Sequence, residues 1–343
     1  METHVVSSDK PTVAILIPEA TRKKILSPEA LDNLASVARV RLPNGSSLTP
    51  EDLAPMLDGA VACITGWGTP PLSADLLALA DKPNVRLVAH TAGSIRNLVP
   101  VDLMEGGLRV SHAAAIIADA VAEFVISEAL LGLRPLHEID LAMRAGEEWK
   151  TLRERTMGRL LSACTVGIVG AGYVGRKVIH LFQAFGSRIL VYDPLLSPKS
   201  AADLGAMQQS LDDLLAVSDV VSLHAPVLPE TRGMIGAAQL ARLRDGALII
   251  NTARAALVDE DALLSELQSG RISAALDVFA TEPLPIDSPF RALPNVILSP
   301  HAAGHTTDTY LRQGQAMVED VRRYLRGEPL VFEVSAQMLP TMA

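Results

Sequence analysis

The stretch 165–194 constrains this chain more than any other part of it. It opens with 166–169, an apolar, β-branched run with the length of a buried strand. The letters G-A-G-Y-V-G follow at 170–175, and apolar residues then recur at helical spacing. A second apolar run, 189–192, leads directly to Asp193. This order predicts a buried strand, a glycine-rich turn, a helix and a second strand.

Each glycine of this turn has its own physical role. Gly170 permits the sharp turn from strand to helix, Gly172 lets the backbone approach a pyrophosphate, and Gly175 lets helix and strand pack closely. Amide groups at the helix N-terminus favour phosphate, and Asp193 is placed to accept hydrogen bonds from ribose hydroxyls. Because this carboxylate would repel the extra phosphate of NADP, the stretch predicts an NAD site. The alternative is a glycine-rich turn in an unrelated α/β protein.

Length and composition limit what the rest of the chain can be. At 343 residues the chain is long for one core, so two domains are expected. Apolar residues make up 49% and charged residues 20%, as in ordinary globular proteins, and the net charge is −9. No cluster of basic and aromatic residues is present, which argues against a nucleic-acid partner.

Three further features predict a cytoplasmic protein with neither a membrane span nor a metal site. Cys63 and Cys164 lie far apart in apolar runs, as buried thiols do, and indicate no disulfide or metal framework. Residues 1–12 are polar and lack the apolar centre of a signal peptide. The longest apolar region, 113–133, is interrupted by acidic residues.

Strand and helix patterns alternate along the first part of the chain, which predicts a small parallel-sheet domain. Extended segments are expected at 13–17, 37–42, 61–64, 85–89 and 108–110, and helices at 28–36, from Thr49 onward and at 73–80. One helical pattern, 111–134, is long enough to connect two domains. The polar segment 136–157 is interpreted as an arm that contacts a partner subunit or as a charged, solvated surface.

The second half continues the nucleotide-binding unit. Strands are expected at 220–223, 247–251, 273–277 and 296–298, and a last helix at 307–325. Ligands of open α/β sheets bind beyond the carboxyl ends of the strands. Arg254, Glu282 and His301 each follow one of these strands, so we expect the three side chains to lie near one ligand site.

These three residue types suit one reaction. Arg254 can hold a carboxylate through two parallel hydrogen bonds, and His301 can act as an acid and base near neutral pH. Glu282 can accept the second ring N–H and favour the protonated ring. Taken singly, each has a plainer interpretation: a surface ion pair, a turn residue before proline, or a structural histidine. Their shared placement beyond a dinucleotide motif favours a catalytic set.

With these motifs in place, the chain resembles the D-isomer-specific 2-hydroxyacid dehydrogenases. The matching segments are G-A-G-Y-V-G with Y-D-P, H-A-P-V-L-P-E-T-R-G-M-I, I-N-T-A-R with V-D-E-D-A-L, L-D-V-F-A-T-E-P-L-P and S-P-H-A-A-G, in family order. The resemblance implies that Arg254, Glu282 and His301 are catalytic. The resemblance also implies a set of NAD-binding residues that includes those of the glycine motif: Gly170, Gly172, Tyr173, Val174, Gly175, Asp193, Pro226, Thr231, Thr252, Ala253, Arg254, Asp277, His301 and Gly304.

The resemblance also implies the fold class and domain organisation. The fold is α/β, with two doubly wound parallel-sheet domains. A Rossmann NAD-binding domain would span 111–305, and a smaller flavodoxin-like substrate domain would span 1–110 and be completed by 306–343. The active site would lie in the cleft between the domains, and the chain would form a homodimer through the NAD-binding domain.

A loop in the first domain is implied to bind the substrate carboxylate through its backbone N–H groups. The implied substrate-binding residues are Ala92, Gly93, Ser94 and Arg254. This loop is less glycine-rich than is usual in the family, and Ala255 stands where the family usually has glycine. Trp67 lies at another strand end of the same domain and is expected to shape the pocket. These departures bear on the substrate rather than on the chemistry.

The sequence therefore predicts an NAD-dependent oxidoreductase that transfers hydride between nicotinamide and C2 of a D-2-hydroxy acid or 2-keto acid. His301 would act as the acid and base, Arg254 would hold the carboxylate, and Glu282 would orient the imidazole. Two alternatives stay open. One is a relative that acts on a phosphorylated hydroxy acid or formate, and the other is a non-enzymatic NAD-sensing scaffold like the corepressors of this fold.

Overall fold

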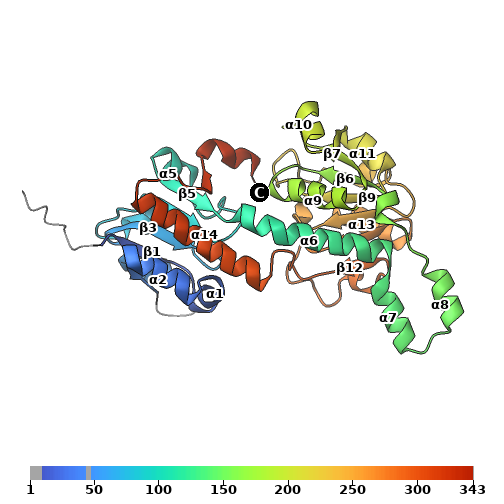
Figure 1. Cartoon of the computed structure of the whole chain (residues 1–343), viewed down its shortest axis with the longest axis horizontal. Coiled ribbons are helices and arrows are strands. Elements are labelled where there is room, and N and C mark those ends of the chain that lie inside the picture. The colour runs from blue at the N-terminus through green and yellow to red at the C-terminus, as the bar shows by residue number, and fades with distance from the viewer. Residues whose placement is uncertain (1–9, 44–47, 343) are drawn as a thin grey trace, which may run out of the picture. The chain divides into compact units, whose positions relative to one another are not determined.

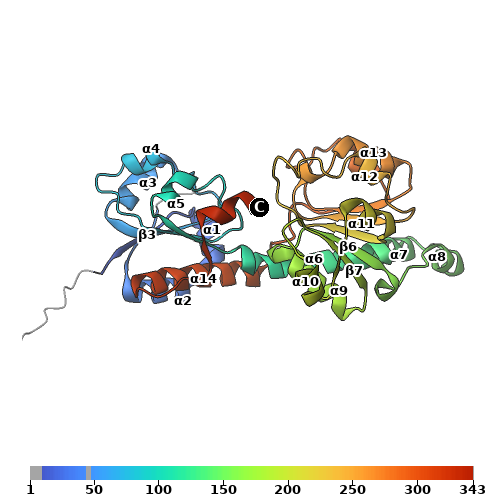
Figure 2. The same cartoon turned by 90° about the horizontal axis from the view of Figure 1, so that it is seen from above.

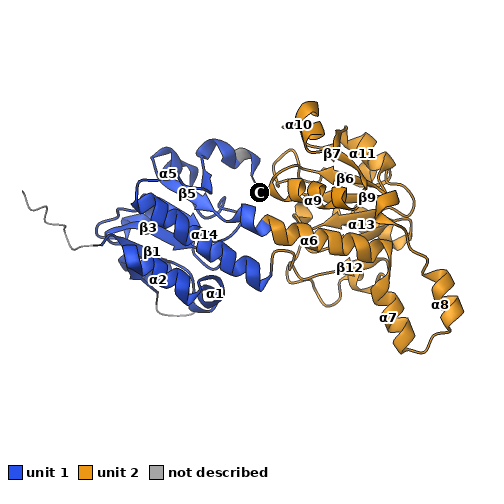
Figure 3. Cartoon of the chain, in the orientation of Figure 1, with its two compact units in different colours: residues 1–117, 305–343 blue, residues 118–304 orange. Residues whose placement is uncertain are grey.

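The computed structural model describes residues 10–43 and 48–342. The polar start of the chain, 1–9, on which part of the localisation prediction rests, lies outside these residues. The chain divides into two compact units, Met1–Ile117 with His305–Ala343, and Ala118–Gly304 (Figure 3). We call them unit 1 and unit 2. Unit 1 includes residues to 117, and the strand Arg109–His112, which crosses the predicted boundary at 110, belongs to its sheet.

Unit 1 contains a six-stranded sheet in the order β13-β5-β4-β3-β1-β2 (Figure 1). Its strands are β1 (Thr12–Ile15), β2 (Arg39–Arg41), β3 (Ala60–Thr65), β4 (Leu87–His90), β5 (Arg109–His112) and β13 (Glu333–Val334). All neighbours are parallel except β13, which pairs antiparallel with β5 through Glu333 opposite Ser111. The last strand of the chain thus closes the edge of a sheet built from the first 112 residues.

Helices cover both faces of this sheet (Figure 2). One face carries α1 (Glu19–Ile25), α2 (Pro28–Val37) and α14 (Thr307–Leu325), and the other carries α3 (Pro50–Leu57), α4 (Ala74–Ala78) and α5 (Val101–Glu105). The expected start at Thr49 is confirmed, because its side chain and that of Asp52 form a capping box. Gly314 lets α14 approach α1, since a Cβ there would collide with the carbonyl oxygen of Ile25.

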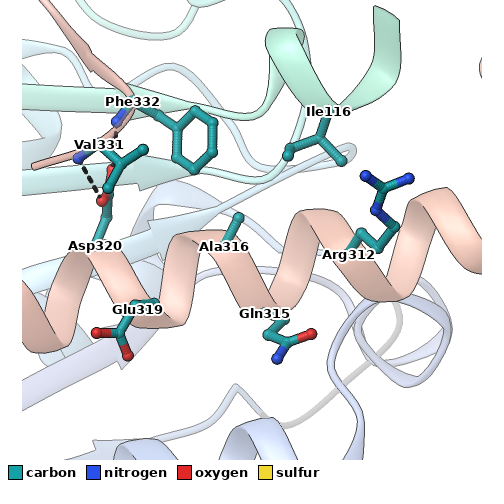
Figure 4. Close-up of a pocket in the computed structure, with 8 residues that line it drawn as sticks. All are labelled: Ile116, Arg312, Gln315, Ala316, Glu319, Asp320, Val331 and Phe332. Carbon is teal, nitrogen blue, oxygen red and sulfur yellow. Dashed lines mark hydrogen bonds between the residues drawn. The ribbon is translucent and has the colours of Figure 1, made fainter. Parts of the chain in front are cut away.

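Figure 4 shows how the C-terminal segment is attached to α14. The buried carboxylate of Asp320 accepts hydrogen bonds from the backbone N–H of Val331 (2.8 Å) and of Phe332 (3.1 Å). Beside these contacts lies a hollow of about 240 Å³, lined in part by Ile116 and Ala316. None of the residues predicted for a site lines this hollow. Both Asp320 carboxylate oxygens accept from backbone N–H groups, so the role of Asp320 is structural.

Unit 2 contains a seven-stranded sheet in which all pairs are parallel, in the order β12-β11-β10-β9-β6-β7-β8. Its strands are β6 (Thr165–Val169), β7 (Arg188–Tyr192), β8 (Met207–Gln208), β9 (Val220–Leu223), β10 (Leu248–Asn251), β11 (Ser273–Leu276) and β12 (Val296–Leu298). The strands predicted at 220–223 and 296–298 are confirmed at both ends. The two-residue edge strand β8 was not predicted, because a strand this short has no readable alternation.

The helices of unit 2 also lie on two faces (Figure 2). One face carries α6 (Ala114–Leu133) and α9 (Tyr173–Ala184), and the other carries α11 (Leu211–Val217), α12 (Ala237–Leu240) and α13 (Glu260–Gln268). Lys177 on α9 forms an ion pair with Asp119 on α6 (2.8 Å). Shorter elements are α7 (Leu136–Arg144), α8 (Trp149–Arg155), α10 (Pro198–Asp203) and 3-10 turns at Leu161–Ala163, Ala255–Leu257, Pro289–Ala292 and, in unit 1, Ala336–Thr341.

The long helix predicted over 111–134 begins later than expected, at Ala114. Ser111 and His112 belong instead to β5, where both are buried between β4 and β13. Strand pairing therefore outweighs the local helical pattern at these positions. Within residues 10–43 and 48–342, no helix is both long enough and apolar enough to cross a lipid bilayer.

Candidate active site

The glycine-rich turn of unit 2 has the geometry that a pyrophosphate needs. Gly170 has φ of +97°, which favours glycine, and a Cβ on Gly175 would collide with the carbonyl oxygen of Gly170. A Cβ on Gly172 would instead meet no protein atom within 4 Å. The turn ends where α9 begins at Tyr173, whose side chain is exposed. Open space thus lies in front of Gly172, at the N-terminus of a long helix, where phosphate binds.

Asp193 follows β7 and ties that strand to the same turn. One of its carboxylate oxygens accepts from the backbone N–H of Ala171 (2.7 Å), and the other accepts from the N–H of Leu195 (2.9 Å). Each oxygen retains a lone pair that can accept from a ribose hydroxyl. The turn, the helix N-terminus and this carboxylate therefore fit a dinucleotide with an unphosphorylated ribose.

Other residues predicted to bind NAD lie at the ends of the neighbouring strands. After β9, the hydroxyl of Thr231 donates to the carbonyl of Pro226 (2.6 Å), which folds the H-A-P loop back on itself. After β10, Thr252 is buried, and its hydroxyl has no hydrogen-bond partner among the residues that the structure describes. Ala253 is held by its N–H bond to Asn251 (3.1 Å). The buried hydroxyl is a polar group left for a ligand.

The structure brings the predicted catalytic residues together in unit 2. His301 Nδ1 and Glu282 Oε2 lie 2.8 Å apart, and Glu282 Oε1 accepts from the backbone N–H of Phe279 (3.1 Å). Arg254 lies close enough for its charge to act on Glu282. Burial alone would raise the pKa of Glu282, but its hydrogen bonds and the neighbouring positive charge lower that pKa below its usual value. Glu282 is therefore a carboxylate aimed at the imidazole.

Asp277 holds the turn that carries His301. Its buried carboxylate accepts from Ser299 Oγ (2.6 Å) and from the backbone N–H groups of Ala302 (2.7 Å) and Ala303 (3.0 Å). Its backbone oxygen accepts from the N–H of His301 (2.9 Å). His301 has φ of 53°, a left-handed conformation that is uncommon for a residue other than glycine. Asp277 was predicted as an NAD contact, and the structure adds this supporting role.

Glu128 on α6 is a residue whose importance the sequence did not reveal. Its side chain is only 3% exposed, and neither carboxylate oxygen has a hydrogen-bond partner among the described residues. Burial and the nearby negative charge of Asp277 raise the pKa of Glu128 to about 8. In the sequence, Glu128 shares a helical face with the apolar residues Val121 and Phe124, and this spacing is a signal of burial.

The loop predicted to bind the substrate carboxylate, 92–94, lies in unit 1 beyond β4. His112 Nδ1 is 2.7 Å from the carbonyl oxygen of Gly93, and burial lowers the pKa of His112, so the neutral ring donates to this oxygen. Burial also lowers the pKa of His90 to about 4. Within the described chain, the N–H groups of Gly93 and Ser94 have no hydrogen-bond acceptor. Free amides on a pinned loop suit an anionic group.

The remaining candidate groups are potential metal ligands and the two cysteines. Among residues 10–43 and 48–342, no group of three or more His, Cys, Asp or Glu side chains is placed to hold a metal ion. Cys63 and Cys164 are both buried and unbridged, and burial raises the pKa of Cys63 to about 12. Both thiols are therefore poor nucleophiles.

Comparison with known proteins identifies the class of this fold and site. The NAD-binding domain of the D-isomer specific 2-hydroxyacid dehydrogenases matches residues 126–303, nearly all of unit 2. The chain belongs to the D-isomer specific 2-hydroxyacid dehydrogenase family. Unit 2 is accordingly an NAD-binding domain, and the predicted fold class and cofactor are confirmed.

Individual relatives differ in what they act on. The chain is 36% identical over 268 residues to a glyoxylate reductase of Aeropyrum pernix, covering 76% of this chain and 78% of that protein. It is 39% identical over 256 residues to a D-3-phosphoglycerate dehydrogenase of Mycobacterium leprae, covering 74% of this chain but only 48% of that protein. A phosphoglycerate oxidoreductase of Rhizobium etli has a similar structure, with a TM-score of 0.78, 31% identity, and coverage of 94% of this chain and 97% of that one.

Proposed function

We propose that the protein is an NAD-dependent D-2-hydroxyacid dehydrogenase that interconverts a 2-hydroxy acid and its 2-keto acid. The observation that carries this proposal is the His301–Glu282 pair, 2.8 Å apart, in the same unit as Arg254 and the NAD-binding turn. An imidazole held by a carboxylate is the arrangement that proton transfer to a carbonyl oxygen requires. Bound NAD would supply the two-electron acceptor or donor for C2 of the substrate.

The protein's own residues would handle the proton and the carboxylate. In the oxidation direction, neutral His301 takes the proton of the substrate hydroxyl, and in the reduction direction the protonated ring returns it to the carbonyl oxygen. Glu282 accepts from Nδ1, which holds the ring and favours its protonated form. Arg254 binds the substrate carboxylate through its planar guanidinium. In unit 1, the free amides of Gly93 and Ser94 suit an anionic group.

The proposal is tested by adding a set of 2-keto acids to the protein with NADH and following the loss of absorbance of NADH. We expect turnover of at least one acid, and His301→Ala should lose at least about 100-fold in kcat, the usual contribution of a general acid. NADH binding, measured by fluorescence, should be retained. Arg254→Lys keeps the charge but loses the planar fork, so kcat/KM for the keto acid should fall while NADH affinity stays.

The role of Glu282 has a separate readout in the pH profile. Replacing it with Gln removes the charge that favours the protonated ring, so the high-pH limb of keto-acid reduction should move to lower pH. The low-pH limb of hydroxy-acid oxidation should move in the same direction, because one group serves both reactions. Limbs that do not move would separate Glu282 from His301. NADH binding without turnover of any acid would favour the NAD-sensing scaffold instead.

We also propose a homodimer formed through unit 2. The segment 136–157, which contains α7 and α8, carries large apolar side chains that this chain leaves exposed, including Leu141 (66%), Trp149 (65%) and Met157 (84%). Such a concentration of exposed apolar residues is typical of a protein–protein interface. Sedimentation equilibrium should give twice the mass of the chain, and a concentration-independent monomer would refute this part.

A further inference from the structure

Three aromatic rings gather at one end of the sheet in unit 1. Trp67 follows β3, and its ring centroid lies 5.3 Å from that of Tyr310 and 6.1 Å from that of His305. The hydroxyl of Tyr310 is 2.9 Å from His305 Nδ1. The contacts fix the rings relative to one another, although 39% of the Trp67 surface stays exposed. An exposed, held indole is an apolar surface ready for a ligand group.

The turn that carries Trp67 is packed against Thr91, the residue that directly precedes the loop with the free amides. A Cβ on Gly66 would lie 2.5 Å from the Thr91 hydroxyl, and the N–H of Thr91 donates to the carbonyl of Thr65 (2.8 Å). Gly68 has φ of +86°, and a Cβ there would lie 2.9 Å from a side-chain carbon of Pro18. Both glycines are therefore needed for this turn, and Gly66, the neighbour of Trp67, holds it against the strand end from which loop 92–94 leads.

This end of the sheet has little positive charge for a phosphate. The loops 16–18, 66–73 and 91–95 contain neither lysine nor arginine. Arg96, the next cation in the chain, donates from Nη2 to the carbonyl oxygen of Leu339 (2.9 Å). Arg312 on α14 lines the hollow shown in Figure 4. Recognition of a phosphomonoester usually employs arginine or lysine, so this surface suits an uncharged group better.

We propose that Trp67, with Tyr310 and His305 behind it, selects an unphosphorylated 2-keto acid whose C3 substituent is apolar and preferably aromatic. The inference rests on the proposed function, because it assigns a substrate class to that reaction. The free amides of loop 92–94 bind the carboxylate, and the C3 substituent contacts the indole. Phosphohydroxypyruvate and glyoxylate are poor substrates, the first because its charge lacks a partner and the second because it has no C3 substituent.

The test compares kcat/KM for phenylpyruvate, glyoxylate and phosphohydroxypyruvate in the parent, Trp67→Ala and Trp67→Phe. We expect the parent to prefer phenylpyruvate over phosphohydroxypyruvate by at least about tenfold, equal to about 1.4 kcal/mol. Trp67→Ala should lose about tenfold for phenylpyruvate and less than about twofold for glyoxylate, and Trp67→Phe should recover part of the loss. A parent that prefers the phosphorylated acid, or a Trp67→Ala variant that loses equally for all three, overturns the proposal.

A second measurement does not depend on turnover. The chain has two tryptophans, so Trp149→Phe leaves Trp67 as the sole indole. Phenylpyruvate added to this variant with NAD should change the Trp67 emission with saturation, whereas phosphohydroxypyruvate at the same concentration should not. No saturable change with phenylpyruvate refutes the aromatic site. If no keto acid is turned over but this change occurs, the proposed function fails and the binding inference stands.

Discussion

Replacing Glu128 with Gln should change how the stability of the protein depends on pH. Glu128 is buried on α6 with both carboxylate oxygens unpaired among the described residues, and its pKa is raised from 4.5 to about 8. Between these two values the unfolded chain has released this proton while the folded protein still holds it. The free energy of unfolding therefore falls as pH rises through that window. Gln carries no such proton, so the variant should lack this fall.

The size of the effect follows from the shift. The change from 4.5 to about 8, at about 1.4 kcal/mol for each unit, corresponds to about 5 kcal/mol when the window is fully crossed. Linkage places about 3 kcal/mol of this between about pH 5 and pH 8. The free energy of unfolding of Glu128→Gln, relative to the parent, should thus rise by about 3 kcal/mol over that interval.

Urea unfolding at a series of pH values measures this difference directly. The new amide is expected to shift the free energy of unfolding by the same amount at every pH. Only the part of the difference between the two proteins that changes with pH tests the raised pKa of Glu128. Glu123→Gln is the matched control, because it is the same substitution on the same helix at an exposed position. An offset for Glu128→Gln that is the same at both ends of the range would show that Glu128 has an ordinary pKa in the folded protein.

Two further substitutions test the nucleotide-binding turn. We expect the parent to prefer NADH over NADPH by at least about tenfold in kcat/KM. Asp193→Ala should reduce this preference, because it removes the charge that repels the extra phosphate. Equal kcat/KM values for both cofactors in the parent would refute this role of Asp193. Gly175→Ala should weaken NADH binding and cost about 1–3 kcal/mol of stability, because the new Cβ meets the Gly170 carbonyl. Calorimetric NADH titration and urea unfolding measure both effects, and an unchanged variant would mean that the turn can relax.

The sequence allowed much of unit 2 to be predicted because its signals are local. The glycine turn, its flanking strands and Asp193 lie within one short stretch, and each residue has a backbone or charge requirement that can be read directly. Arg254, Glu282 and His301 could be grouped because parallel strands end at one edge of a sheet. In the structure, Glu282 and His301 are in contact.

Features that depend on distant neighbours could not be predicted in the same way. The strand identity of Ser111 depends on Glu333, which lies far away in the chain. The left-handed backbone conformation of His301 is held by hydrogen bonds of its turn to Asp277, and no nearby residue type predicts this conformation. The raised pKa of Glu128 depends on burial and on the charge of Asp277. The helical spacing of Glu128 indicates burial, but it does not indicate that Asp277 lies nearby.

The order in which the two units become complete during synthesis follows from the path of the chain. Unit 2 is one continuous segment, so all of it has been made once the ribosome passes residue 304. Unit 1 begins first but finishes last, because α14 covers one face of its sheet and β13 pairs with β5. Until both arrive, the nascent protein presents an open strand edge and an uncovered apolar face, which are sites for aggregation and chaperone binding. The segment from His305 to Ala343 is thus needed to complete the unit that residues 1–117 begin.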